Sequence, residues 1–80
     1  MAREPVGEKE MRLGLLIRRL RIEKRLPQHE FAALAGIDRS YQGRIERGEA
    51  SISIEKLDLL AQKLGLKGWE LLKRLEENGH

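Results

Sequence analysis

Several residue types are scarce or absent in this 80-residue sequence. It has no cysteine, two prolines, and one residue each of tryptophan, tyrosine and phenylalanine. Because thiols are absent, neither a disulfide framework nor a thiolate zinc site can form, which fits a reducing compartment such as the cytoplasm. We therefore expect a fold that relies on apolar packing, near the lower size limit of a single stable domain.

Long apolar segments are absent as well. The longest run of large apolar side chains is Leu15-Leu16-Ile17, whereas a membrane-spanning helix needs about 20 apolar residues. The opening residues MAREPVGEKE contain no apolar segment of the kind found in secretory signals. We expect a soluble, cytoplasmic protein that makes no contact with a membrane.

Charged residues are abundant and unevenly distributed. Residues 1–48 contain eleven Lys/Arg against seven Asp/Glu, and residues 49–80 contain five against six, which together give the net charge of +3. A basic first half indicates a surface that meets a polyanion such as nucleic acid. A Lys/Arg-rich helix surface with no such partner explains the same numbers equally well.

Apolar residues recur at intervals of three and four along most of the chain, which predicts amphipathic helices and no strand. Pro27, Gly36, Gly48 and Gly65 separate the periodic segments, and these residue types are typical of helix starts and ends. The predicted fold is all-α and compact. Its five helices are expected over residues 11 to 24 or 25, 28–35, 38–47, 54–64 and 68–77.

The ends of the predicted helices carry further detail. Residues 1–10 show charge without a period and are expected to be a flexible arm, so that the domain covers residues 11–80. Asp38 and Ser53 are expected to cap the helices that follow them by accepting a backbone N–H bond. Gly14 is expected to weaken the first helix by roughly 1 kcal/mol relative to alanine. In the second helix, Phe31, Leu34 and Ala35 are expected to face inward.

The third helix is unusually polar, since Ile45 is its only fully aliphatic side chain between Arg39 and Arg47. At about 100° per residue, Tyr41 and Ile45 share one face of this helix. The opposite face carries Arg39, Ser40, Gly43 and Arg47.

A thin, donor-rich helix face of this kind suits the major groove of DNA, where guanine offers two acceptors to an arginine. A short helix, a tight turn with glycine and a second short helix make a helix-turn-helix, in which the second helix reads the bases. A solvated face on a helical bundle is the structural alternative. Spacing alone leaves both readings open.

A wider set of residues resembles the lambda-repressor-like helix-turn-helix family, which includes phage repressors and Cro and the xenobiotic-response-element proteins. The string DRSYQGRIERG looks most like the restriction–modification controller proteins within it. The resemblance covers roughly residues 13–72. It is carried by Leu20-Arg21, Leu26, Gln28, Phe31-Ala32, Leu34-Ala35-Gly36-Ile37, Tyr41, Ile45-Glu46-Arg47-Gly48, Leu57, Leu60-Ala61 and Leu64-Gly65.

The resemblance implies a role for each matching position. Arg21 is expected to form a structural ion pair with Glu46. Tyr41 is expected either to donate its hydroxyl to a phosphate or to pack as a partly buried core aromatic. The positions expected to read bases are Arg39, Ser40, Gly43 and Arg44. The positions expected to contact phosphates are Gln28, Tyr41, Arg47, Ser51 and Ser53.

Two positions depart from the family pattern. Gln42 stands where an apolar core residue is usual, and the sequence leaves open whether it lies at the edge of the core or helps to read bases. Arg25 stands where a glycine often ends the first helix. If its backbone is left-handed, we expect a cost of roughly 1–2 kcal/mol.

One reading helix contacts too few base pairs to select a genomic site, and proteins of this architecture usually dimerise. The last predicted helix offers more apolar surface than its own domain needs, so we expect a homodimer. Ile52 and Ile54 could contribute, and completion of the monomer core is the alternative use of the same residues. The interface is expected at Trp69, Leu71, Leu72 and Leu75.

The predicted function is a sequence-specific regulator of transcription, a repressor or dual regulator, that binds double-stranded DNA as a homodimer on a near-palindromic operator. The alternative is an antitoxin or other protein-interaction module that binds a partner protein through its C-terminal helix. Catalysis has little support, because the only histidines are His29 and His80 and no phosphate-binding glycine loop or metal-spaced carboxylate cluster occurs. We expect no enzyme, metal, cofactor or small-molecule ligand.

Overall fold

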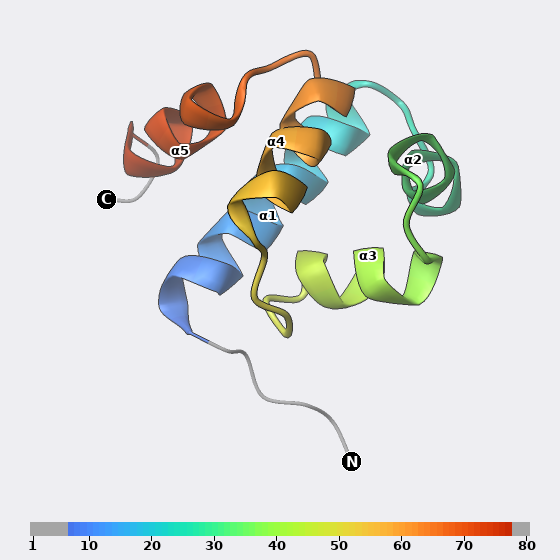
Figure 1. The fold of residues 1–80 in the computed structure, drawn as a ribbon, viewed down its shortest axis with the longest axis horizontal. Helices are drawn as coiled ribbons and strands as arrows, with labels where there is room; N and C mark the ends of the chain where they lie inside the picture. Colours follow the sequence, from blue (N-terminus) through green and yellow to red (C-terminus); the bar gives the residue numbers. More distant parts are fainter. Residues whose placement is uncertain (1–6, 78–80) are drawn as a thin grey trace.

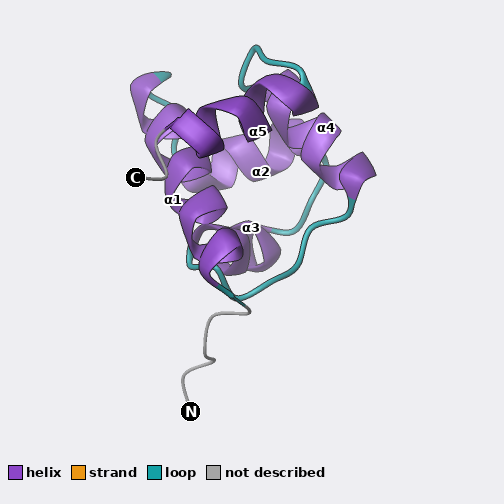
Figure 2. Ribbon diagram, turned by 90° about the vertical axis from the view of Figure 1, so that its left-hand side faces the viewer, coloured by secondary structure: helices purple, strands orange, loops and turns teal. Residues whose placement is uncertain are grey.

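A computed structural model of the protein describes residues 7–77, which form five helices joined by short loops (Figure 1). Within this range no strand occurs (Figure 2), and none of the helices has the length and the apolar character that a membrane span requires. The prediction of an all-α fold with five helices is confirmed. The helices are α1 (Glu8–Glu23), α2 (Gln28–Ala35), α3 (Arg39–Glu46), α4 (Ile54–Lys63) and α5 (Gly68–Glu77).

All five helices contribute to one core. Helix α1 packs against α3 and α5, helix α2 packs against α3 and α4, and α4 packs against α5. Each helix places one large apolar side chain fully inside this core, so every helix helps to form it. These side chains are Ile17, Phe31, Ile45, Leu60 and Leu71.

The first helix begins earlier than its apolar pattern indicates. Helix α1 starts at Glu8, so residues 8–10 of the predicted arm are helical, and residues 1–6 lie outside the described residues. Glu8 and Glu10 sit in the first turn, where the helix dipole favours acids even without an apolar period. At the other end, Arg25 has the left-handed backbone considered above, with φ at +58°.

Two of the local predictions have opposite outcomes. The Ser53 hydroxyl accepts a hydrogen bond from the backbone N–H of Lys56 at 3.1 Å and caps α4 as expected. The expected cap at Asp38 is wrong, because its side chain makes no cap bond to α3. Its Oδ2 instead accepts a hydrogen bond from the Ser40 hydroxyl at 3.0 Å.

The prediction that Leu34 faces inward is also wrong, since this side chain is exposed. The buried face of α2 consists of Phe31, Ala32 and Ala35. At about 100° per residue, Leu34 lies roughly 60° from Phe31 on the side away from Ala35, and therefore at the edge of that face.

Gly14 marks the crossing of α1 and α3. A Cβ atom at this position would lie 2.7 Å from the carbonyl oxygen of Glu46 and in contact with that of Ile45. No side chain can be accommodated there unless one of the two helices moves. Glycine is a weak helix former, but at this position the close approach of α1 and α3 requires it.

Candidate nucleic-acid interface

Helices α2 and α3 form a helix-turn-helix. Gly36 ends α2 with φ at +68°, and the backbone N–H of Ile37 donates to the carbonyl of Ala32 at 3.0 Å, which closes the turn. Both views place α3 at the lower margin of the fold, away from α5 (Figures 1 and 2). One side of α3 packs on α1 and α2, and within residues 7–77 its other side is free of these helices, with Arg39 and Ser40 exposed.

The free side of α3 forms a shallow hollow with the start of α2. Three of the six residues that line it are arginines, and none of the six is acidic. The hollow therefore gathers hydrogen-bond donors and positive charge on one face, a combination that suits an anionic, acceptor-rich partner. The lining residues are Gln28, Arg39, Ser40, Gly43, Arg44 and Arg47.

The residues predicted to read bases occupy different positions in this hollow. Arg39 and Ser40 are exposed at the start of α3, and Arg44 is half-buried. Gly43 is buried, because the side chain of Arg47 covers it: the Arg47 Nη1 atom lies 3.0 Å from where a Cβ of residue 43 would stand. In the described structure, Gly43 itself does not present an open surface.

Tyr41 lies at the edge of this face. Its ring packs against the core and is contacted by two cations, with the Arg44 guanidinium 5.3 Å and the Lys56 ammonium 5.8 Å from the ring centroid. Cation–π contacts of this kind stabilise by about 0.5–1 kcal/mol at exposed sites. The ring therefore has the packing role that the sequence left as one alternative, and it restricts the Arg44 side chain.

Arg47 and the loop after α3 form the end of the interface. Arg47 is exposed, and its Nε lies 3.1 Å from Oε2 of Glu49. Ser51 and Ser53 are exposed, but the Ser53 hydroxyl already accepts the cap bond from Lys56. The Ser53 hydroxyl retains its own proton for donation.

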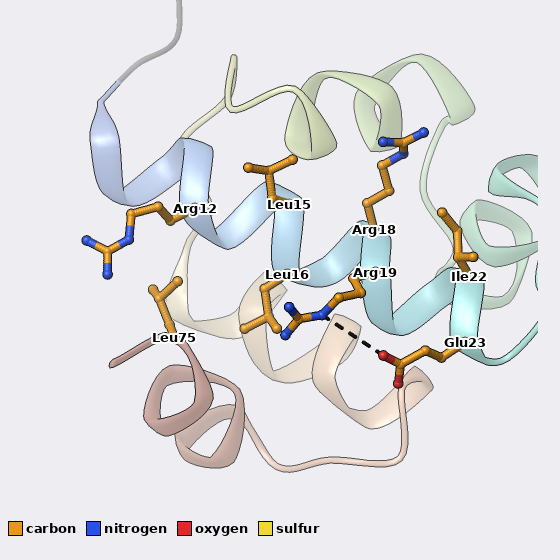
Figure 3. Close-up of a pocket in the computed structure, with 8 residues that line it drawn as sticks. All are labelled: Arg12, Leu15, Leu16, Arg18, Arg19, Ile22, Glu23 and Leu75. Carbon is orange, nitrogen blue, oxygen red and sulfur yellow. Dashed lines mark ion pairs between the residues drawn. The ribbon is translucent and has the colours of Figure 1, made fainter. Parts of the chain in front are cut away.

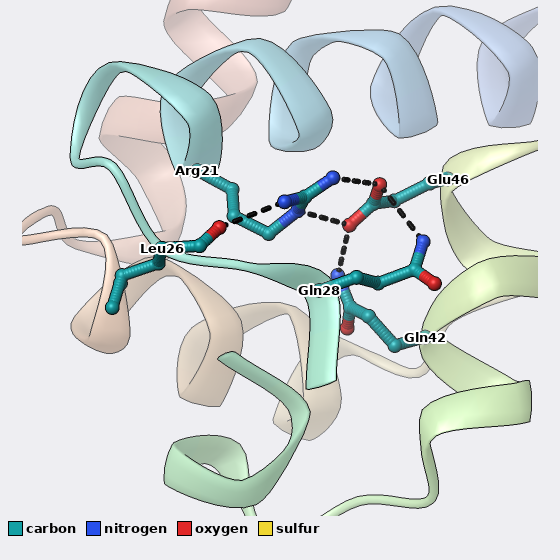
Figure 4. A network of polar contacts seen from close by, with 5 residues as sticks. All are labelled: Arg21, Leu26, Gln28, Gln42 and Glu46. Atoms are coloured by element: carbon teal, nitrogen blue, oxygen red, sulfur yellow. Dashed lines mark hydrogen bonds and ion pairs between the residues drawn. The ribbon is translucent and has the colours of Figure 1, made fainter. Parts of the chain in front are cut away.

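Beneath this face, Glu46 accepts hydrogen bonds from three side chains (Figure 4). Arg21, which is expected to pair with it, binds both carboxylate oxygens, with Nε at 2.8 Å and Nη2 at 2.9 Å. The Arg21 and Glu46 side chains are only 9% and 3% exposed. Gln42 Nε2 donates to Glu46 at 2.7 Å, and Gln28 Nε2 donates at 3.2 Å.

This network decides several properties of its members. Burial raises the pKa of Glu46, but the hydrogen bonds, first that of Arg21, together hold its pKa below its usual value of 4.5. Gln42 is fully buried and bonded to Glu46, so it does not face the hollow on α3. Its Oε1 has no hydrogen-bond partner among residues 7–77. Gln28, expected at a phosphate, is joined to the core through the same carboxylate. No pattern in the sequence indicates that either glutamine binds to the ion pair.

The apolar residues of α5 divide into two groups. Leu71 is fully buried, so its predicted place in a dimer interface needs correction: it faces the core of its own chain. Leu75 also packs against the core, whereas Trp69 and Leu72 are 61% and 45% exposed. Ile54 at the start of the neighbouring α4 is exposed as well. The exposed large apolar side chains of α4 and α5 are therefore Ile54, Trp69 and Leu72.

A groove between α1 and α5 is a second surface feature, which the sequence did not indicate (Figure 3). Leu15, Ile22 and Leu75 supply apolar side chains, and Arg19 pairs with Glu23 at 4.0 Å along its edge. The groove brings no reactive group together. Among residues 7–77 there is also no group of three histidines, cysteines or carboxylates that could hold a metal ion.

Comparison with known proteins assigns the class. Residues 17–72 match the helix-turn-helix family (HTH_3), which is more than half of the chain, and the chain belongs to this family. The family assignment agrees with the resemblance found in the sequence and with the α2–α3 geometry.

Within the family, the similarity extends to restriction–modification controller proteins. The chain is 35% identical over 68 residues to control protein C.MunI of a Mycoplasma species, covering 84% of this chain and 92% of that protein. The crystal structure of the controller protein C.AhdI from Aeromonas hydrophila is similar with a TM-score of 0.72 and 39% identity, covering 76% and 92% of the two chains. The antitoxin PezA of Streptococcus pneumoniae is 39% identical over 54 residues, which are 68% of this chain but only 34% of PezA.

Proposed function

We propose that the protein is a sequence-specific transcriptional regulator that binds double-stranded DNA as a homodimer on a near-palindromic operator. The observation that carries this proposal is the hollow on α3, where three arginines and a serine gather on a face without an acidic lining residue. The similarity to two controller proteins, C.MunI and C.AhdI, supports the same function. We place the protein in the cytoplasm with its DNA.

In this proposal α3 lies in the major groove. Arg39 and Ser40 are exposed at its start and meet base edges first, and Arg44, restricted by the Tyr41 ring, meets the next base pair. Gln28 at the first turn of α2 and the loop with Ser51 and Ser53 approach the phosphates on either side. Occupying a promoter would block polymerase, whereas binding just upstream would recruit it.

Selection from random DNA tests the proposal directly. We expect the recovered duplexes to share two inverted half-sites centred about one helical turn apart, because a two-fold dimer presents two α3 helices. Affinity for the selected duplex should fall steeply with salt, since bound phosphates release counterions. Recovery of no common motif, or an affinity that does not change with salt, would contradict the proposal.

The dimer is expected to form through Ile54, Trp69 and Leu72, the exposed apolar residues of α4 and α5. Leu72→Glu should weaken dimerisation about 100-fold or more, because a two-fold interface loses the burial of two leucines and would have to accommodate two charges. Sedimentation equilibrium measures the change. Leu15→Glu is the control, because it makes the same substitution at an exposed leucine of α1. Dissociation by Leu15→Glu alone would place the interface on α1 instead.

A partner-binding module is the second candidate, because the same apolar surface on α5 could hold another protein and one relative is the antitoxin PezA. The two candidates differ in the order of assembly. A regulator that dimerises through α5 is a dimer alone at micromolar concentration, whereas a module with that surface reserved for a partner is a monomer until the partner binds.

A further inference from the structure

Glu49 is a mostly buried carboxylate at the edge of an interface otherwise rich in positive charge. It follows Gly48, whose φ of +75° turns the chain out of α3, and its own N–H donates to the Arg44 carbonyl at 2.8 Å. Its side chain is 15% exposed, whereas that of its ion-pair partner Arg47 is 59% exposed. The fixed member of the pair is therefore Glu49, and the arginine is the member that can reach a ligand.

Arg47 is directed back along α3 toward Gly43, one helical turn earlier. Its Nε lies 3.1 Å from Glu49 Oε2, and its Nη1 lies 3.0 Å from the position of a Cβ at residue 43. The Gln28 Oε1 lies 3.7 Å from the same position. Because Gly43 has no side chain, the Arg47 guanidinium has room to lie over it, next to Gln28.

We propose that Glu49 is a positioning residue that holds Arg47 over Gly43, and that Arg47 thereby reads a base in the groove. This inference rests on the proposed function. Glu49 engages the Nε side of the guanidinium, so the two terminal nitrogens remain as a fork of the kind that matches O6 and N7 of guanine. A contact to a phosphate at the rim, the role that family resemblance gives Arg47, needs no such space in the middle of α3.

Neither stability nor simple attraction accounts for the pair. An ion pair with one member this exposed adds little to stability. A carboxylate at a DNA-binding face repels phosphates and lowers affinity for every sequence alike. If Glu49 already holds Arg47 in one orientation, less side-chain entropy is lost when Arg47 contacts DNA. Affinity rises by this amount only on a DNA sequence that presents the matching base edge. Within residues 7–77, Arg18 and Glu49 line the same depression of the surface, but they form no ion pair with each other.

The test compares affinity for the duplex selected by the wild-type protein with affinity for a scrambled duplex, by fluorescence anisotropy at several salt concentrations. Glu49→Gln should bind the scrambled duplex more tightly, because a negative charge is lost, and yet lower the specific-to-scrambled ratio about fivefold or more. Gly43→Ala, which changes no charge, should lower the same ratio by displacing the guanidinium. Arg47→Ala should lower it roughly 5- to 150-fold per half-site, with the loss confined to one base pair.

Glu23→Gln on α1 is the matched control, because it removes the same charge from an exposed ion pair away from α3 and should leave the ratio unchanged. An equal gain of Glu49→Gln on both duplexes would overturn the inference, since Glu49 would then act by repulsion only. A uniform loss with Arg47→Ala across sequences, with the salt slope reduced by about one per chain, would also overturn it by making Arg47 a phosphate contact. If the wild-type protein selects no motif, the proposed function fails, whereas selection with unchanged ratios in these variants removes the inference alone.

Discussion

Replacing Glu46 with alanine is expected to lower the free energy of unfolding by about 3–5 kcal/mol, a large part of the stability of a domain this small. The variant leaves the Arg21 guanidinium buried without a counter-charge, and it removes the acceptor of Gln28 and Gln42. An uncompensated buried charge costs more than the lost attraction, because it has given up its hydration. Urea denaturation followed by circular dichroism measures the effect.

Two variants separate this explanation from a general sensitivity of the fold. Glu23→Ala breaks the exposed pair with Arg19 and should cost less than about 1 kcal/mol. Arg21→Met combined with Glu46→Leu removes both charges and should recover much of the lost stability. If the double variant were as unstable as Glu46→Ala, the stranded charge would not be the cause, and loss of packing or the unpaired amide of buried Gln42 would account for the effect.

The pH dependence of stability gives the same network a second signature. The pKa of Glu46 is lowered in the folded protein from its usual 4.5, so the carboxylate adds stability at pH values above about 4.5. That contribution is lost as the pH falls below 4.5 through the folded-state pKa. Glu46→Gln cannot titrate, so the stability difference between wild type and this variant should shrink over that acidic range. A difference that stays constant from neutral to acidic pH would contradict the assignment.

The sequence was sufficient where one local rule decided the structure. Helices α2 and α5 have the bounds that their apolar period and flanking residues predicted. The Ser53 cap followed from the residue type at the start of a helix. The left-handed backbone of Arg25 was only a condition, raised by the glycine that the resembling family often has at that position. Asp38 shows the limit of this reasoning, because its oxygen had two possible donors and took the Ser40 hydroxyl instead of a backbone N–H.

Features that depend on how helices meet could not be derived from periodicity. Gly14 is a weak helix residue in isolation, and only the crossing of α1 with α3 shows why a side chain is excluded there. Leu71 and Leu72 are adjacent and chemically identical, and the direction of α5 against the core decides that one is buried and the other exposed. A surplus of apolar residues predicted an interface, but not which of them form it.

The polar network under α3 was the largest omission. The ion pair of Arg21 with Glu46 came from family resemblance, since the two residues are 25 positions apart and no local pattern links them. Gln42 stands at a position where the family has an apolar core residue, and its bond to Glu46 explains how a buried amide is accommodated there. The network joins the C-terminal end of α3 to α1 and α2, so α3 is held in place by buried charge as well as by apolar packing.

The largest functional effect is expected at Arg39. This arginine is exposed at the start of α3, in the hollow of the proposed interface. Loss of one base-reading arginine costs about 1–3 kcal/mol. Because a homodimer carries the substitution in both half-sites, Arg39→Ala should weaken operator binding by about 2–6 kcal/mol, roughly 30- to 20,000-fold. Anisotropy titration of the selected duplex measures the loss.

The distribution of the loss over sequences is more informative than its size. Arg39→Ala should tolerate any base pair at one position of each half-site, while its affinity for a scrambled duplex changes only as far as one lost charge requires. Arg74→Ala, which removes an exposed arginine from α5, should leave the base preference unaltered. If Arg39→Ala selected the same motif as the wild type, the exposed face of α3 would not be reading bases. The charge gathered there would then serve only to hold the protein on DNA of any sequence.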